Sequence, residues 1–174
     1  MSQIKEIQRP TRSPASRLMA EVRELLDCGS VSAALELLGQ SNQSGRAAAN
    51  AKGVCFMRMG DFRRALPVFR ELVYPAGAFT VPEGTPVAFQ VNFITVLFHL
   101  DQVLVGRTLL REISRSSHPG IGPLKEAERK WKRSLSWWRR LLLVIGAYPS
   151  KPVSLDFPPG VLWDPAEEPA AVNE

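Results

Sequence analysis

Histidine and cysteine are scarce in this chain, whose 174 residues include only two of each. His99, His118, Cys28 and Cys55 do not lie at the spacing of a zinc site. The sequence also lacks a glycine-rich phosphate loop and the sharp nucleophile turn of the α/β-hydrolases. We therefore predict that the protein is not an enzyme, binds no cofactor or metal, and has no small-molecule substrate.

Long apolar runs are absent as well. The longest, from Leu141 to Tyr148, is far shorter than the ~20 residues that a membrane-spanning helix needs. The N-terminus has no apolar segment of the length found in signal peptides. Cys28 and Cys55 lie in apolar, helix-like surroundings, so we expect two buried free thiols and a reducing compartment. These features predict a cytoplasmic protein.

Three turn signals divide much of the chain into similar units: Gly29-Ser30, Gly60-Asp61 and Asp101-Gln102. When the units are aligned on these turns, apolar residues recur at helical spacing, and a small residue recurs five positions after each turn. Small residues let two antiparallel helices approach closely, so each unit is predicted to be a helix hairpin that stacks on its neighbours. The recurring residues are Val22, Gly53 and Ile94; Leu25, Phe56 and Leu97; Val31, Phe62 and Val103; Ala34, Ala65 and Gly106; and Leu38, Phe69 and Leu110.

The second unit resembles a tetratricopeptide repeat. This unit, about residues 46–79, is the clear repeat, the first and third units are degenerate, and the resemblance covers about residues 16–115. It implies an all-α fold in which three helix-hairpin repeats stack as a short right-handed solenoid. The turns are 31 and then 41 residues apart, whereas the family period is about 34. The residues that carry the resemblance are Gly53, Phe56, Gly60, Phe62, Ala65 and Phe69.

Prolines and glycines predict the boundaries of the segments. Residues 74–86 contain five of them and are predicted to form an inserted loop within a helical domain of residues 16–148. We expect a disordered basic arm at residues 1–15, and a proline-rich strap with a disordered tail at residues 149–174. Pro123 suits the first position of a capping helix at residues 123–147. Its inward-facing residues are predicted to include Trp131, Leu135, Trp138 and Leu142.

The resemblance also implies a concave groove that binds a peptide or helix of a partner protein. The stripe that would line it mixes flexible apolar side chains with a few polar groups, as a peptide site requires. The alternative is that the chain's own C-terminal strap covers this stripe. Asn50, Arg58 and Asn92 could hold a terminal carboxylate, but the lysines that some family members use are missing, so we exclude that specificity. The predicted groove residues are Asn50, Val54, Met57, Arg58, Val91, Thr95, Phe98 and His99.

Positive charge is concentrated in the predicted capping helix. Residues 125–140 contain seven basic and two acidic residues, a net of +5 that equals the net charge of the whole chain. Trp131, Trp137 and Trp138 lie among them. The pattern fits a solvated face over a tryptophan-anchored core, or a surface that binds anionic membrane or RNA. The basic face comprises Lys130, Lys132, Arg133, Arg139 and Arg140.

These patterns favour a protein–protein interaction module that acts as an adaptor, a scaffold or a partner-specific chaperone. Its partner would be another protein, bound through a peptide or helix segment in the groove. The alternative is an anionic-surface binder that contacts membrane or RNA through the basic, tryptophan-rich C-terminal helix.

Overall fold

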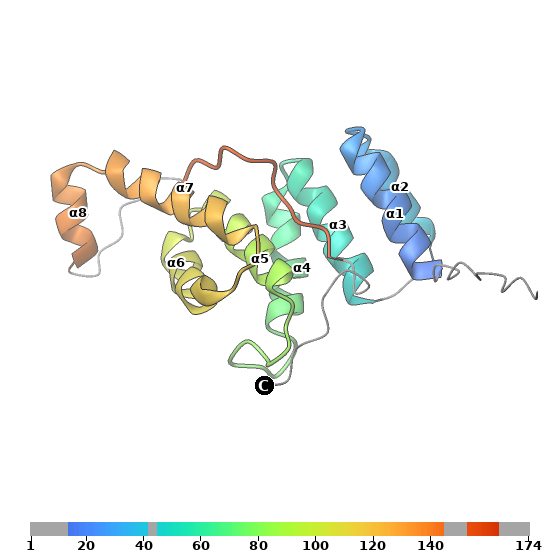
Figure 1. Ribbon diagram of the computed structural model, residues 1–174, viewed down its shortest axis with the longest axis horizontal. Helices are drawn as coiled ribbons and strands as arrows, with labels where there is room; N and C mark the ends of the chain where they lie inside the picture. The colour runs from blue at the N-terminus through green and yellow to red at the C-terminus, as the bar shows by residue number, and fades with distance from the viewer. Residues whose placement is uncertain (1–13, 42–44, 145–152, 164–174) are drawn as a thin grey trace, which may run out of the picture.

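The chain folds into α-helices joined by short turns, followed by an extended segment (Figure 1). The computed structural model describes residues 14–41, 45–144 and 153–163, and these residues include no strand. The predicted all-α fold class is therefore confirmed. The helices are α1 (Pro14–Asp27), α2 (Val31–Gln40), α3 (Arg46–Arg58), α4 (Phe62–Val73), α5 (Val87–His99), α6 (Val103–Glu112), α7 (Ile121–Ser134) and α8 (Trp137–Val144), with a short 3-10 helix η1 (Ile113–Arg115) after α6.

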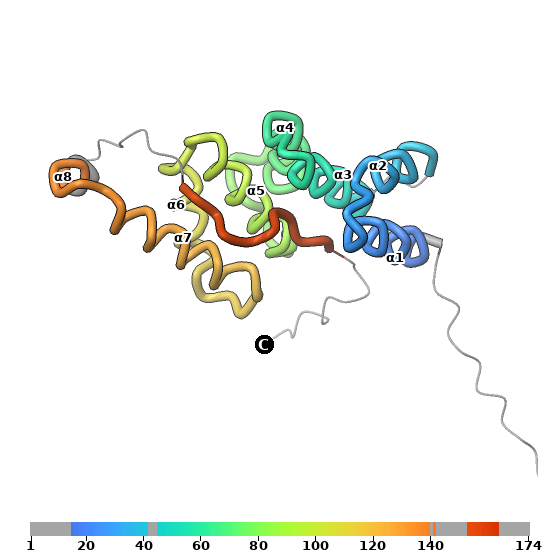
Figure 2. Tube along the Cα trace, turned by 90° about the horizontal axis from the view of Figure 1, so that it is seen from above, coloured from blue at the N-terminus to red at the C-terminus, as the bar shows by residue number. Residues whose placement is uncertain are grey.

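From α1 to α7, consecutive helices pack against each other. Helix α1 also contacts α3, α3 contacts α5, and α5 contacts α7. These four helices therefore form a row on one side of the molecule (Figures 1 and 2). The row matters because it is the surface that the C-terminal segment crosses.

The three predicted turns close their hairpins in the same way. Gly29, Gly60 and Asp101 have φ values of 75°, 77° and 59°, the left-handed conformation that commonly ends a helix. In each turn the amide of the residue after the left-handed one bonds back to a carbonyl in the last turn of the helix. The three bonds run from Ser30 N–H to the Leu25 carbonyl (2.8 Å), from Asp61 N–H to that of Phe56 (2.9 Å), and from Gln102 N–H to that of Leu97 (2.9 Å).

The helices of the second hairpin approach closely at Gly53. A methyl group added to its Cα would lie 2.6 Å from Cζ of Phe69, which comes from α4 and is fully buried. Gly106 has the same role in the third hairpin, where the added carbon would lie 2.7 Å from the Phe98 ring. The recurring small residues Ala34 and Ala65 are also fully buried. The alignment on the turns therefore identifies the interior of the hairpins.

The expectation of one capping helix over residues 123–147 is wrong. Helix α7 ends at Ser134, whose hydroxyl donates to the Trp131 carbonyl at 2.8 Å, and Leu135 has an extended backbone with ψ of 138°. A second helix, α8, then begins at Trp137. Trp131 and Leu135 are buried as predicted, but Trp138 is exposed because the chain changes direction before it. The side chain of Leu142 and residues 145–147 lie outside the described part of the chain.

Residues 74–86, where the prolines and glycines lie, form turns and bends between α4 and α5. The expected basic arm falls almost wholly on residues 1–13, which the structure does not describe, and the expected tail lies outside the described residues from 164 onward. No helix among the described residues is long and apolar enough to cross a membrane.

The close approach at Gly53 predicts the effect of a single methyl group. Gly53→Ala should lower the free energy of unfolding by about 1–3 kcal/mol, because the buried Phe69 ring has to move. Gly39→Ala is the control: its added carbon meets nothing within 4 Å, so the better helix propensity of alanine should leave stability equal or raised by up to about 1 kcal/mol. Urea unfolding of both variants checks this. Equal stability of Gly53→Ala and wild type would contradict the packing.

Candidate functional site

An extended segment of the chain lies across the helix row. We call residues 153–163 the strap. The strap contacts α7, α5 and α3, and Figure 2 shows its path over α5 toward α3. At α7, Lys130 Nζ lies 2.8 Å from Asp156 Oδ2. The strap therefore occupies the side of the molecule where the partner groove was expected.

Two asparagines hold one residue of the strap by its main chain. Asn92 of α5 accepts a hydrogen bond from Val161 N–H at 2.7 Å and donates to the Val161 carbonyl at 2.8 Å. Asn50 of α3 donates to the same carbonyl at 3.2 Å. The asparagines are also joined to each other, because Asn92 Nδ2 donates to Asn50 Oδ1 at 2.9 Å. Both asparagines are 0% exposed.

The two bonds between Asn92 and Val161 resemble those to a neighbouring β-strand, which also donates to and accepts from the main chain of one residue. Bonds to the main chain do not depend on the side chain that the strap carries at that position. The asparagine pair can therefore hold any segment that is extended there and approaches closely enough. The contacts that do depend on side chains lie on either side of Val161.

Glycine and tryptophan make those flanking contacts. Gly160 has φ of +98°, and a carbon added to its Cα would lie 2.7 Å from Cγ1 of Val54. Only glycine fits there without strain. Trp163 packs edge-on against the buried ring of Phe89, with ring centroids 5.0 Å apart and planes at 70°. The strap also packs apolar side chains on the core: Leu155, Phe157, Val161 and Leu162.

The predicted groove residues of the second unit divide between the strap and the interior. Asn50 and Val54 lie under the strap, as described above. Met57 was expected to line an open groove, but it is 1% exposed. Arg58 points away from the strap toward α1, where Nη1 donates to the Leu26 carbonyl at 3.1 Å. Its buried Nε has no hydrogen-bond partner among the described residues.

The predicted residues of the third unit are distributed among different neighbours. Val91 lies against Gly120, in the connection before α7, and Thr95 donates to the Val91 carbonyl within α5 at 2.8 Å. Phe98 was expected on the groove surface, but it is 0% exposed because it packs against Gly106 of α6. His99 stacks on Phe62 of α4. Met57 and Phe98 therefore do not line an open groove.

Asn92 is the site residue that the predicted groove stripe left out. The tetratricopeptide resemblance suggests Asn92 only as a partner for a terminal carboxylate. The signal in the sequence was an asparagine within the apolar run of residues 87–98, because a buried amide needs hydrogen-bond partners. The sequence could not indicate that the partner is Val161, which lies 69 positions away in the chain.

His99 and Phe62 stack with ring centroids 3.8 Å apart and planes at 10°. Burial lowers the pKa of His99 below its ordinary value of 6.5, so the ring is neutral at pH 7.

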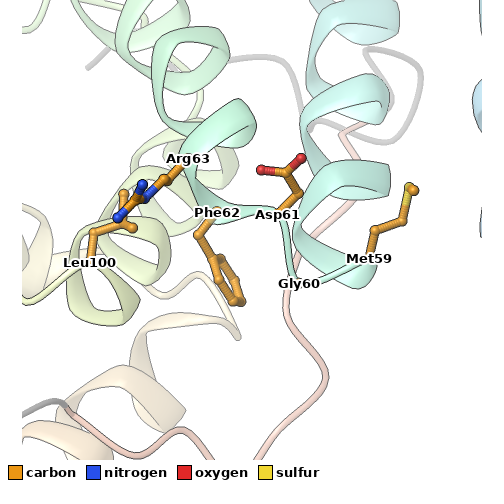
Figure 3. A pocket seen from close by; sticks show the side chains of 6 residues that line it. All are labelled: Met59, Gly60, Asp61, Phe62, Arg63 and Leu100. Atoms are coloured by element: carbon orange, nitrogen blue, oxygen red, sulfur yellow. The ribbon is translucent and has the colours of Figure 1, made fainter.

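A shallow pocket lies beside this stack, at the turn between α3 and α4 (Figure 3). Asp61 lines this pocket, and its carboxylate caps α4 by accepting a hydrogen bond from Arg64 N–H at 3.1 Å. The pocket is lined by Met59, Gly60, Asp61, Phe62, Arg63 and Leu100.

Much of the predicted basic face is paired within the molecule. Lys130 bonds to Asp156 of the strap, and Lys132 lies 2.7 Å from Glu128 Oε1. Burial raises the pKa of Glu128, but the hydrogen bonds from Lys132 and Arg107 together outweigh this effect. The pKa therefore lies below its ordinary value, and the carboxyl is ionised at pH 7. Arg133 is on the exposed side of α7. Arg139 is exposed on α8, and the side chain of Arg140 lies outside the described residues.

The cysteines differ from each other. Cys55 is buried, and burial raises the pKa of its thiol to about 11. Cys28 was expected to be buried too, but it is exposed because it follows the last residue of α1. Within the described segments, no group of three or more histidine, cysteine, aspartate or glutamate residues is placed to hold a metal ion.

Comparison with known proteins adds no relative. No protein-family model matches the chain, and searches of curated proteins and of solved structures found no significant match. The argument for function therefore depends on the geometry of the helix row and the strap.

Removing the asparagine bonds should loosen the strap. Asn92→Leu keeps the side chain about the same size but removes both bonds to Val161, so we expect exchange of the Val161 amide proton to accelerate about tenfold or more. Thr95→Val is the control, because it removes a buried bond within α5 that does not involve the strap. Hydrogen exchange followed by NMR measures both. Unchanged exchange in Asn92→Leu would mean that these bonds do not hold the strap.

The lowered pKa of His99 predicts how stability depends on pH. Below the ordinary value of 6.5, the unfolded chain binds a proton that the folded chain resists, so the free energy of unfolding should fall as the pH decreases. His99→Phe keeps the stacked ring but cannot titrate, and should remove this part of the pH dependence. Thermal unfolding of wild type and His99→Phe across this pH range tests it. An equal pH dependence in His99→Phe and wild type would contradict the prediction.

Proposed function

We propose that this protein is a protein-interaction module that binds an extended segment of a partner protein along the row of α3, α5 and α7. We also propose that its hairpins form a short right-handed solenoid of tetratricopeptide type, and that it acts by binding and not by catalysis. In the free chain, the strap occupies the binding position. A partner segment would replace the strap there.

The observation that carries this proposal is the asparagine pair. Two fully buried amides from different helices converge on the main chain of Val161. A permanent core contact at this position needs no polar group, and burying an amide is costly unless it is hydrogen-bonded. Amides are suited to a position from which an extended chain can leave, because water can bond to them when it does. The pair therefore supports an exchangeable occupant.

The strap indicates what a partner segment should contain. It should be extended at the asparagine pair, with glycine next to that residue where Val54 approaches. An aromatic residue should follow, to pack on Phe89 as Trp163 does. An acidic residue on the other side would pair with Lys130. The partner is accordingly an extended segment with an acidic residue, a glycine and an aromatic residue in that order.

Because the strap belongs to the same chain, it competes strongly. A short connection keeps its effective concentration on the order of millimolar, so a free segment of similar intrinsic affinity binds the intact protein weakly. Weakening the strap should therefore increase the affinity for a segment added in solution.

A strap variant tests this proposal in the full chain. Gly160→Val should expel the strap, because valine is strained at φ of +98° and collides with Val54. We expect a fluorescent peptide with the sequence of residues 153–163 to bind Gly160→Val at least about tenfold more tightly than wild type. Fluorescence anisotropy measures the affinities, and far-ultraviolet circular dichroism shows that the helices remain.

Gly77→Val is the matched control. It introduces the same strain at φ of +85° in the loop of residues 74–86, where an added carbon meets nothing within 4 Å. This variant should bind the peptide as weakly as wild type. A folded Gly160→Val that binds the peptide no better than wild type would contradict the proposal. Adding Asn92→Leu to Gly160→Val should abolish the gained binding.

A further inference from the structure

Helix α8 exposes two tryptophans at the surface. Trp137 and Trp138 are 65% and 61% exposed, and their rings stack with centroids 4.1 Å apart and planes at 27°. Leu141, one turn later, is 49% exposed. By contrast, Trp131 of α7 is buried. Large apolar side chains that gather on a surface mark a site of interaction.

The exposed apolar residues share one side of α8. At about 100° per residue, Trp137, Leu141 and Trp138 fall within an arc of about 100° around the helix axis. Arg139 lies about 100° beyond Trp138, outside this arc, and is exposed. The helix thus combines an aromatic and aliphatic face with a positive charge outside that face.

The break after α7 places this face away from the core. Leu135 is buried, and beyond it α8 extends past the end of α7, at the far end of the molecule from α1 (Figure 1). The strap lies over α7, α5 and α3, on another part of the molecule. The α8 face is therefore separate from the groove of the proposed function.

The charge near this face indicates which kind of partner it binds. Helix α8 itself carries two basic residues, Arg139 and Arg140, and no acidic residue, whereas Lys130 and Lys132 of α7 are paired within the molecule. Tryptophan favours the boundary between lipid headgroups and acyl chains, and nearby basic residues are attracted to anionic headgroups. RNA would stack its bases on open aromatic faces, whereas here the two rings already stack on each other and lie beside an aliphatic side chain. The combination favours lipid.

We propose that α8 docks the protein on an anionic membrane surface, with Trp137, Trp138 and Leu141 inserted at headgroup depth and Arg139 within electrostatic range of the phosphates. This lipid site goes beyond the peptide groove and does not depend on it. One short helix provides a small apolar area, so docking is reversible and depends on the anionic lipid fraction.

Vesicle binding by the full chain tests the proposal. Wild type should co-sediment with vesicles of phosphatidylcholine containing roughly one third phosphatidylserine, and much less with pure phosphatidylcholine. Binding should weaken as salt rises from about 0.05 to about 0.2 M. Trp137→Ala/Trp138→Ala should reduce binding about tenfold or more. Arg139→Gln should reduce binding about fivefold, the effect of one basic residue near such a surface.

Matched controls separate the site from general exposure. Phe79→Ala removes an aromatic side chain that is 98% exposed in the loop of residues 74–86, and should bind as wild type does. Arg63→Gln removes an exposed arginine of α4 and should also bind as wild type. Gly160→Val tests the groove separately, since it should leave vesicle binding unchanged whether or not it gains peptide affinity.

Four results would overturn the proposal. The first is equal binding to vesicles with and without phosphatidylserine. The second is a double tryptophan variant that binds vesicles as wild type does, and the third is one whose melting temperature falls sharply, because α8 would then be part of the core. The fourth is a wild-type protein that does not bind vesicles but binds single-stranded RNA, or that self-associates when the double tryptophan variant does not.

Discussion

Two amides buried beneath an extended chain tie the C-terminal part of this protein to its helices. Asn50 and Asn92 belong to different hairpins and bond to each other as well as to Val161. Because a buried amide is costly without hydrogen bonds, the position of the strap depends on these bonds. The alignment of α3 and α5 in the row brings the two side chains within reach of one peptide unit.

That alignment follows from the way each hairpin closes. The same backbone bond after Gly29, Gly60 and Asp101 gives the three units the same turn, although only the second carries the full set of residues of the tetratricopeptide resemblance. Gly53 and Gly106 then let a phenylalanine ring of the facing helix approach the backbone. Equivalent turns and close contacts place α1, α3 and α5 side by side on one side of the molecule.

The strap and α8 follow each other in the sequence but face different surroundings. The strap provides main-chain groups, a glycine and a tryptophan to a prepared surface, and its Asp156 pairs with Lys130 of α7. Helix α8 keeps its tryptophans outward. The two candidate interaction sites therefore have different chemistry: hydrogen bonds to the main chain beneath the strap, and exposed aromatic side chains on α8.

The sequence by itself determined the elements whose signals are local. Periodic apolar residues predicted the helices from α1 to α6 and part of α7, glycine and aspartate predicted the turns, and the prolines predicted the irregular segment of residues 74–86. Such signals depend on residues a few positions apart, so they can be recognised without the tertiary structure. Asn50 and Val54 were also predicted at the site, because helical spacing places them on one face.

Only the tertiary structure decided what covers each face. Met57 and Phe98 have the spacing of groove residues, but packing between helices buries them, and Phe98 faces Gly106 of the next helix. The bonds from Asn92 to Val161 join residues 69 positions apart, a pairing that no local pattern records. The periodicity of the capping helix continued through Leu135, and the break there results from the Ser134 bond and the burial of Leu135. Contacts between distant residues therefore decided whether the groove is open and which tryptophans are exposed.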